Sequence, residues 1–183
     1  MIPHAGADAS PWVRRHAALV KPGARVLDLA AGRGRHARFL ASLGHDVLAV
    51  DRDAAALSAL AGAERVRTLA VDLESGPWPL AGERFDAIVV TNYLHRPSFD
   101  AMLSTLAGDG VLVYETFAAG NEAFGRPSSA DFLLAAGELL DRVRGRLAVV
   151  AFEEGIVERG ADRAVVQRLA AVGPGYARPW RLP

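Results

Sequence analysis

Three short apolar segments, each with an aspartate next to its carboxyl end, constrain the fold of this 183-residue chain more than any other feature. They span residues 25–29, 46–50 and 66–71. Such segments are typical of buried strands, and strands that alternate with helical stretches predict βαβ units of a parallel sheet. Because ligands bind outside the carboxyl ends of such strands, Asp28, Asp51 and Asp72 are candidate site residues.

The remaining segments extend this pattern to seven strands. Further strands are expected over 85–90, 111–114, 146–152 and 164–171, with a turn at 108–110 and a helix from Ser98 to Leu106. The connection 153–163 is too short for a helical crossover, so the last strand should be antiparallel to the others. We therefore expect an α/β fold, a Rossmann-like, doubly wound, mostly parallel seven-stranded sheet with an antiparallel C-terminal strand.

The length favours a single domain over residues 1–183. We expect it to contain an N-terminal helix, a cofactor-binding core, a loop and helix over an acceptor pocket, and a closing hairpin. These parts would span 1–22, 23–117, 118–145 and 146–183.

Composition excludes several classes of function. The 21 basic and 21 acidic residues balance, so no overall positive field predicts a nucleic-acid partner. The chain has no cysteine, which excludes disulfides and thiolate metal sites. Its five histidines are scattered, so we expect no metal, and we expect His36 to act only as a local cap. No signal-peptide pattern or apolar run of about 20 residues occurs, which favours a cytoplasmic protein without a membrane segment.

A glycine-rich turn follows the first strand. Gly32 and Gly34 allow the backbone to approach a ligand, and the helix that follows offers free amides. The turn also fits a dinucleotide fingerprint, with Asp51 at about the 20-residue spacing expected for a ribose contact. Asp28 favours a cationic ligand over a dinucleotide, because a carboxylate at this position repels a pyrophosphate and attracts an ammonium or sulfonium group.

Four segments in order, 26–34, 50–51, 71–73 and 85–90, resemble the successive motifs of the class I S-adenosylmethionine-dependent methyltransferases. The resemblance extends over about residues 26–120. The Gly-Arg turn at 33–35 and the segment 40–47 are further similar to the small tellurite-resistance-type branch of that superfamily.

This resemblance implies S-adenosylmethionine as cofactor, S-adenosylhomocysteine as product, and no metal. Asp28 would hold the methionyl amino group, Asp51 the ribose hydroxyls, and Asp72 with the Leu73 backbone the adenine. The full set of implied cofactor-binding residues is Asp28, Ala30, Gly32, Gly34, Asp51, Arg52, Asp72, Leu73 and Asn92. The family usually has glycine where Ala30 stands. Each aspartate could instead cap the following helix or turn.

The acceptor site is less clear from the sequence. Tyr93 and His95 follow the fourth strand and are weak catalytic candidates. His95 could act as a general base or could be a loop histidine bonded to backbone. The stretch 115–130 lacks periodicity and is long enough to predict a functional loop. We expect the substrate pocket to include Tyr93, His95, Glu115, Asn121 and Phe124.

The expected function is transfer of a methyl group from S-adenosylmethionine to a small-molecule acceptor by in-line displacement. Two alternatives stay open, a small NAD(P)-dependent oxidoreductase and a non-catalytic module that binds a cofactor or a partner. The sequence does not indicate the oligomeric state or which acceptor is used.

Overall fold

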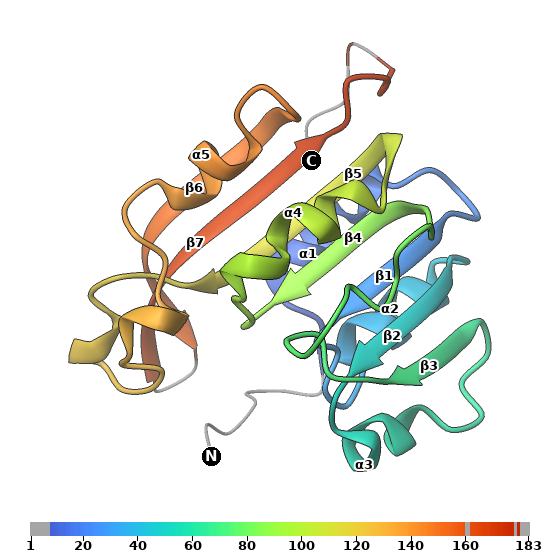
Figure 1. Cartoon of the computed structure of the whole chain (residues 1–183), viewed down its shortest axis with the longest axis horizontal. Helices are drawn as coiled ribbons and strands as arrows, with labels where there is room; N and C mark the ends of the chain where they lie inside the picture. Colours follow the sequence, from blue (N-terminus) through green and yellow to red (C-terminus); the bar gives the residue numbers. More distant parts are fainter. Residues whose placement is uncertain (1–7, 160–161, 178, 180–183) are drawn as a thin grey trace.

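Seven strands form one sheet in the computed structural model, which describes residues 8–159, 162–177 and 179. Their order across the sheet is β3-β2-β1-β4-β5-β7-β6 (Figure 1). The strands β1 to β5 pair in parallel, and β7 runs antiparallel to both of its neighbours. The bounds are β1 Arg25–Leu29, β2 Asp46–Asp51, β3 Val66–Ala70, β4 Phe85–Thr91, β5 Leu106–Phe117, β6 Ala148–Arg159 and β7 Asp162–Val172. The predicted α/β fold is confirmed.

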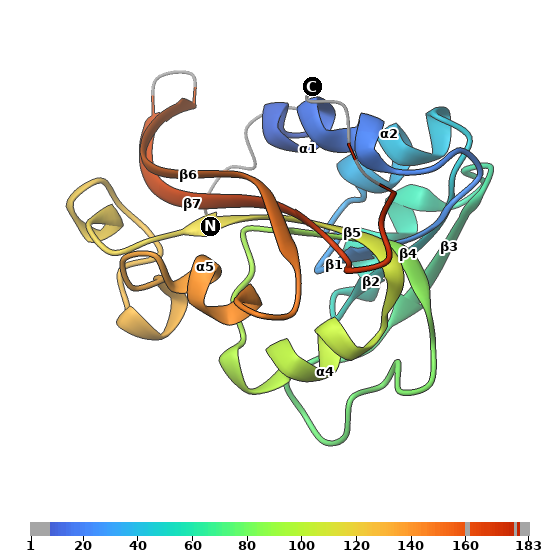
Figure 2. The same cartoon turned by 90° about the horizontal axis from the view of Figure 1, so that it is seen from above.

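Short helices cover both faces of the sheet. Figure 2 shows α1 and α2 on one face and α4 and α5 on the other. The α-helices are α1 Pro11–His16, α2 Arg35–Ser42, α3 Ala54–Leu57, α4 Phe99–Ser104 and α5 Glu138–Val143. Single 3₁₀ turns lie at Ala17–Leu19, Ser58–Leu60, Arg96–Ser98, Asn121–Ala123 and Ala130–Phe132. In the described part of the chain, no helix has the length and apolar character needed to span a membrane.

The central strands are buried on both faces. Ile88 and Val90 of β4 belong to one apolar cluster with side chains of α4 and α5. The alternate residues Ala87 and Val89 belong to the opposite cluster, which includes Trp12 of α1. Burial of each large aliphatic side chain stabilises the fold by about 1.5–3 kcal/mol. The central strands therefore hold fixed the points from which the loops at their ends begin.

The direction of strand addition reverses at β1. The strands β2 and β3 are added on one side of β1, and the chain then crosses to β4 and β5 on the other side. In open parallel sheets this reversal leaves a crevice outside the carboxyl ends of the central strands. The ends of β1 and β4 are therefore the place to look for a ligand site.

Several predicted boundaries are wrong. The expected turn at 108–110 lies inside β5, because the amide of Gly173 donates to the carbonyl of Gly110 at 2.8 Å. The closing hairpin has longer strands than predicted, since β6 and β7 continue into the expected connection. The helix expected from Ser98 to Leu106 begins at Phe99 and ends at Ser104, and Ser98 makes no side-chain cap.

Candidate cofactor and acceptor site

Asp28, near the end of β1, carries a buried oxygen without a partner. Asp28 is only 1% exposed, and its Oδ2 atom accepts from the amide of Ala37 at 2.9 Å. The other oxygen, Oδ1, has no hydrogen-bond partner. Burial raises the pKa of Asp28 to about 7, against the opposing effects of the Ala37 amide and Arg35. A buried acceptor left without a partner costs about 1–3 kcal/mol, so this oxygen needs a donor.

The turn after β1 has an unusual backbone. Ala30, Gly32 and Gly34 all have positive φ, at 55°, 54° and 73°. At Gly34 the positive φ favours glycine, and an added Cβ atom would also displace the side chain of Leu60. The helix α2 begins directly after the turn, at Arg35, and its first turn contacts Asp28 through the amide of Ala37.

Asp51, at the end of β2, contacts this turn. Its Oδ2 accepts from the amide of Gly32 at 2.7 Å, and its Oδ1 accepts from the amide of Asp53 at 2.9 Å. Asp53 in turn caps α3 through the amide of Ala56 at 2.9 Å. The helix cap thus belongs to Asp53, and Asp51 joins the ends of β1 and β2. Arg52 lies between Asp51 and Asp53 in the sequence and is exposed.

Asp72 and Leu73 follow β3 at the same edge of the sheet. Asp72 is exposed and accepts from the amide of Glu74 at 2.9 Å, while Leu73 is 8% exposed. Burial raises the pKa of the Tyr93 hydroxyl, and the negative charges of Glu74 and Asp72 raise it further. The Tyr93 side chain therefore lies near these two acids. The structure therefore places Tyr93 beside the β3 end of the site.

The segment after β4 holds Asn92 and His95. Asn92 has a positive φ of 55°, and its amide donates to the carbonyl of Glu115 at 2.9 Å. The Nδ1 atom of His95 lies 2.9 Å from Ser98 Oγ, which also donates to the His95 carbonyl at 3.3 Å. In the tautomer that donates from Nδ1 to Ser98, Nε2 of His95 keeps its lone pair and is able to accept a proton.

His36 does more than the local capping expected from the sequence. Its Nε2 accepts from the amide of Ser10 at 3.2 Å, and its Nδ1 lies 3.4 Å from the hydroxyl of Thr91. Burial lowers the pKa of His36 to about 3, so the ring stays neutral. His36 thereby ties the start of α1 to the end of β4. A local sequence pattern contains no signal for these contacts, because His36 is 26 residues from Ser10 and 55 residues from Thr91.

Glu115 is buried in a network of polar side chains. Its Oε2 lies 2.8 Å from Arg168 Nε, an ion pair without the angle of a hydrogen bond, and 3.4 Å from the hydroxyl of Ser10. Arg168 also pairs with Glu153 at 3.3 Å. The structure therefore uses Glu115 to join β5, β7 and α1. Arg168 was missed by sequence reasoning, because the contact depends on the antiparallel pairing of β5 with β7.

Asn121 and Phe124 lie in the loop beyond β5 (Figure 1). Both ends of the amide group of Asn121 have partners: Nδ2 donates to the carbonyl of Pro127 at 2.9 Å, and Oδ1 accepts from the amide of Val165 at 3.1 Å. Phe124 is 39% exposed and lies under the guanidinium of Arg163. The structure does not bring these two side chains together with Tyr93 and His95.

Arg96 joins the segment after β4 to the same loop. It forms a bidentate pair with Glu138 of α5 at 2.9 and 2.8 Å. It also donates to the carbonyls of Asp131 at 2.9 Å and Leu133 at 2.7 Å. Burial opposes ionisation of Glu138, but Arg96, the Ala135 amide and Arg142 bring its pKa to about 2. Sequence reasoning missed Arg96, since its partners are 34 or more residues away.

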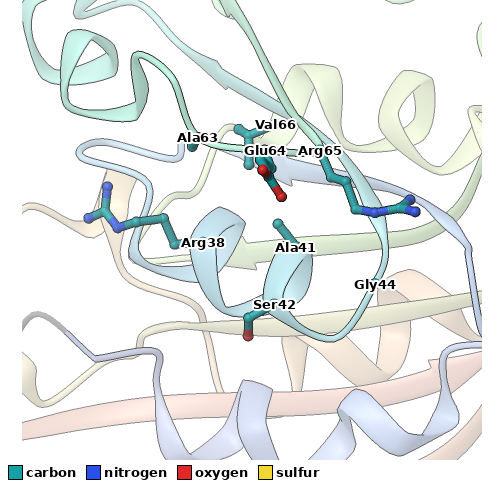
Figure 3. Close-up of a pocket in the computed structure, with 8 residues that line it drawn as sticks. All are labelled: Arg38, Ala41, Ser42, Gly44, Ala63, Glu64, Arg65 and Val66. Atoms are coloured by element: carbon teal, nitrogen blue, oxygen red, sulfur yellow. The ribbon is translucent and has the colours of Figure 1, made fainter.

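Two open hollows lie on the surface. One, of about 540 Å³, lies at the amino ends of β2 and β3, with Arg38 and Arg65 at opposite rims (Figure 3). The other, of about 360 Å³, lies between Arg96 and the loop, with Leu133 and Leu134 in its wall. The first is at the wrong end of the strands for the site around Asp28. Among the described residues, no group of three or more histidine or acidic side chains is arranged to hold a metal ion.

Comparisons with known proteins agree with this geometry. Residues 26–108 match a family described as a methyltransferase domain. No curated protein matches the chain. Among solved structures, TehB from Haemophilus influenzae is similar with a TM-score of 0.76 and 20% identity, over 90% of this chain and 62% of that one. The present chain thus spans less than two thirds of that protein.

Two further structures cover more of their own length. A TehB-like SAM-dependent methyltransferase from Corynebacterium glutamicum has a TM-score of 0.63 and 22% identity, over 91% of this chain and 89% of that one. The Burkholderia thailandensis 1,6-didemethyltoxoflavin-N1-methyltransferase has a TM-score of 0.65 and 24% identity, over 93% and 79%. Its structure contains 1,6-didemethyltoxoflavin and S-adenosylhomocysteine. Residues 26–108 therefore match the methyltransferase-domain family, and the chain has the fold of these S-adenosylmethionine-dependent methyltransferases, with TehB-like proteins among its structural neighbours.

Proposed function

We propose that this protein binds S-adenosylmethionine at the carboxyl ends of β1, β2 and β3 and transfers its methyl group to a small-molecule acceptor. The observation that carries the proposal is Asp28 Oδ1, a buried acceptor without a partner beside the glycine-rich turn. The ammonium group of the methionyl part supplies the donor that this oxygen lacks. Asp51 and the turn at Gly32 then lie on the ribose side of the same site.

The remaining residues fit the other parts of the cofactor. Both oxygens of Asp51 already accept an amide, but each carboxylate oxygen has a second lone pair for a ribose hydroxyl. Asp72 and Leu73 lie on the adenine side, and the proximity of Tyr93 to Asp72 supports a place for its ring there. The proposal assigns the cofactor site to Asp28, Ala30, Gly32, Gly34, Asp51, Arg52, Asp72, Leu73 and Asn92.

The same observation argues against the oxidoreductase alternative. A pyrophosphate brought to the turn would face the carboxyl group of Asp28, whose ionised form burial already disfavours and a second negative charge would disfavour further. Repulsion between like charges in a buried site is large compared with the same interaction in water. A cationic ligand instead stabilises the ionised form of Asp28.

When bound, the cofactor supplies a methyl group that its sulfonium has already activated. The chain's own residues have to align the acceptor and exclude water, effects that contribute about 7–11 kcal/mol in the best oriented reactions. His95 is positioned to accept a proton at Nε2 if the acceptor must lose one. A base is not obligatory for an acceptor that is already nucleophilic.

The acceptor side is proposed to lie between the segment after β4 and the loop 118–137. Tyr93 and His95 come from the first of these elements, and Glu115 comes from the end of β5. Asn121 and Arg96 hold the loop in place. A small-molecule acceptor is supported by the structural neighbour that contains 1,6-didemethyltoxoflavin.

The proposal is tested by incubating the protein with S-adenosylmethionine and a panel of small thiols, amines, phenols, carboxylates and metalloid oxyanions. We expect S-adenosylhomocysteine to form with at least one of them. The Asp28→Asn variant is the control and should form little or none. Tight cofactor binding with no product from any acceptor would instead support the non-catalytic module.

A further inference from the structure

We propose that the open hollow between Arg96 and the loop 118–137 holds the methyl acceptor, and that Glu122 selects acceptors that carry a cationic amine on an apolar body. This inference rests on the proposed function and adds to it the chemical class of the acceptor. The amine is the group that the site recognises. The atom that takes the methyl group is a second nucleophile on the same molecule, a hydroxyl or a thiol.

The hollow lies between the two elements that form the acceptor side. Arg96, in one wall, directly follows His95 in the segment after β4, and Ala119, in another, follows the end of β5. The volume of the hollow, about 360 Å³, is in the range of pockets that hold small molecules. A compound bound there therefore lies next to the segment that carries the candidate base.

Most of the wall is apolar and is fixed by backbone hydrogen bonds. It contains Leu133, Leu134 and the exposed alanines Ala119, Ala130 and Ala135. The amide of Leu134 donates to the carbonyl of residue 117 at 3.0 Å, and the amide of Ala119 donates to the carbonyl of Leu134 at 2.9 Å. These bonds attach the wall to the end of β5. Such a wall favours a ligand with an apolar body, because contact removes both apolar surfaces from water.

Arg96 offers little to an anion, although it is a basic residue in the wall of the hollow. Its bidentate pair with Glu138 uses two N–H groups, at 2.9 and 2.8 Å. The other three donate to the carbonyls of Ala130, Asp131 and Leu133, at 3.3, 2.9 and 2.7 Å. All five N–H groups of the guanidinium therefore have partners.

Glu122 is an acidic residue in the wall of the hollow, and it has an oxygen to offer. Its side chain is exposed, and Oε2 accepts from the amide of Gly120 at 2.9 Å. In the part of the chain that the structure describes, no basic side chain forms an ion pair with Glu122. The positive charge of Arg96 is balanced by Glu138, whereas the negative charge of Glu122 has no counterion there. A cationic occupant supplies that counterion.

The reaction needs a second group on the acceptor. An amine that Glu122 holds stays protonated, and an ammonium nitrogen has no lone pair for the methyl group. A hydroxyl or thiol elsewhere on the molecule does have one. Its oxygen or sulfur forms the bond to the methyl carbon, and the bond from that carbon to the sulfonium breaks with its electron pair left on sulfur. The proton of the hydroxyl or thiol goes to Nε2 of His95.

The charge of Glu122 also disfavours anionic acceptors. A carboxylate or a metalloid oxyanion in the hollow would face Glu122 and would find no N–H group of Arg96 left to bind it. Like charges repel, and the repulsion grows as the ligand displaces water. Amines with a second nucleophile should therefore be methylated in preference to carboxylates and oxyanions.

Two matched sets of acceptors test the assignment. The first set is tyramine, para-ethylphenol and para-hydroxyphenylpropionate, and the second has a thiol in place of each phenolic hydroxyl. Within a set the nucleophile stays the same while the tail is cationic, neutral or anionic. Formation of S-adenosylhomocysteine gives kcat and KM for the wild type, Glu122→Gln and, as a matched control, Glu64→Gln. Glu64 is exposed and lines the other hollow, at the amino ends of β2 and β3.

We expect the amine of at least one set to have a kcat/KM about 5- to 50-fold above that of the anionic member, between the effects of a surface ion pair and a charged hydrogen bond. Glu122→Gln should raise the KM of the amine, leave kcat nearly unchanged and reduce the preference to less than about threefold. Glu64→Gln should keep the preference. Glutamine retains an acceptor for the Gly120 amide, and unchanged affinity for S-adenosylhomocysteine shows that the variant is folded.

Three results would overturn the role of Glu122. Equal use of the three tails, or a preference for the anion, would mean that the site does not select a cation. A preference for the amine that survives in Glu122→Gln would place the recognising charge elsewhere. Methylation of no member by a protein that binds S-adenosylhomocysteine would exclude this acceptor class. Failure of the proposed function looks different, because the wild type would then not bind S-adenosylhomocysteine.

Discussion

Asp28 makes cofactor binding and stability oppose each other at a single side chain. Its pKa in the folded protein is about 7, against about 3.9 in an unfolded chain. The folded state therefore favours the neutral carboxyl group, and the stability that this group contributes is present below about pH 4 and is lost as the pH rises through 7. A cationic ligand favours the ionised form that the empty site disfavours.

The Asp28→Asn variant should separate these two effects. It keeps an acceptor for the Ala37 amide but cannot ionise, so its free energy of unfolding relative to the wild type should rise by roughly 2–4 kcal/mol between pH 4 and pH 8. Its affinity for S-adenosylhomocysteine should fall at pH 8. Urea unfolding at several pH values and calorimetry measure the two quantities. A pH-independent difference in stability would show that Asp28 has an ordinary pKa.

Ala30 is a second residue of the site whose conformation costs stability. Its φ of 55° is a left-handed conformation that costs an L-residue about 1–2 kcal/mol more than glycine. Ala30→Gly should therefore stabilise the protein by about 0.5–1 kcal/mol, after the greater flexibility of glycine in the unfolded chain is subtracted. Thermal unfolding of the variant measures this. Destabilisation would mean that the alanine methyl group makes a contact worth more than the strain.

At the scale of elements, Arg96 connects three parts of the acceptor side. Its five N–H groups have partners in α5 and in the 3₁₀ turn and strand-like segment at 130–133. Arg96→Ala should lower the free energy of unfolding by about 1–3 kcal/mol, since it leaves Glu138 and several carbonyls without their donor. Hydrogen exchange should become faster across residues 130–138.

A matched variant on α5 controls for loss of charge. Arg144 pairs with Asp141 at 2.6 Å, but both side chains are exposed. Arg144→Ala should change stability by less than about 1 kcal/mol, as is usual for surface pairs. Calorimetry on Arg96→Ala should show unchanged affinity for S-adenosylhomocysteine. An equal effect of both substitutions would contradict a special role for Arg96.

Local sequence predicted the elements well where the pattern is local. The apolar runs that became β1, β2, β3 and β4 carry their signal within a few residues, and so does the turn at Gly32 and Gly34. The predicted start of β5 was wrong. Residues 106–110 are extended because they pair with a segment some 65 residues later, around Gly173. Such pairing leaves no trace in a short window.

The whole molecule has a pH dependence that combines two opposing groups. The pKa of His36 is about 3 when folded and about 6.5 when unfolded, so its contribution to stability is present above pH 6.5 and is lost as the pH falls toward 3. Asp28 changes stability in the opposite direction over an overlapping range. The two contributions, each up to about 4 kcal/mol, should largely cancel in the wild type.

Two variants should reveal this cancellation. Asp28→Asn should lose stability on acidification from pH 7 to pH 4 more steeply than the wild type does. His36→Gln should lose it less steeply, or gain stability, over the same range. Chemical unfolding at half-unit steps of pH measures all three curves. Parallel curves would show that neither side chain has the pKa inferred from its burial.

The candidate site divides in the same way between what sequence predicts and what it does not. Asp28, Asp51 and Asp72 could be placed from strand ends alone, because parallel strands bring their carboxyl ends to one edge. The contact of Ser10 with His36, the pair of Glu115 with Arg168, and the ties of Asn121 to β7 all depend on segments distant in sequence. These contacts on the acceptor side therefore could not be predicted from the sequence and were found only in the structure.

Titration calorimetry of the wild type with S-adenosylmethionine, S-adenosylhomocysteine and NAD tests the central claim most directly. The claim is that the buried, unpartnered oxygen of Asp28 belongs to a site for a cationic amino-acid-bearing nucleoside. The account predicts micromolar binding of the first two ligands and none of NAD, with affinity for both falling below pH 7 as Asp28 becomes protonated. Binding of NAD alone would contradict it.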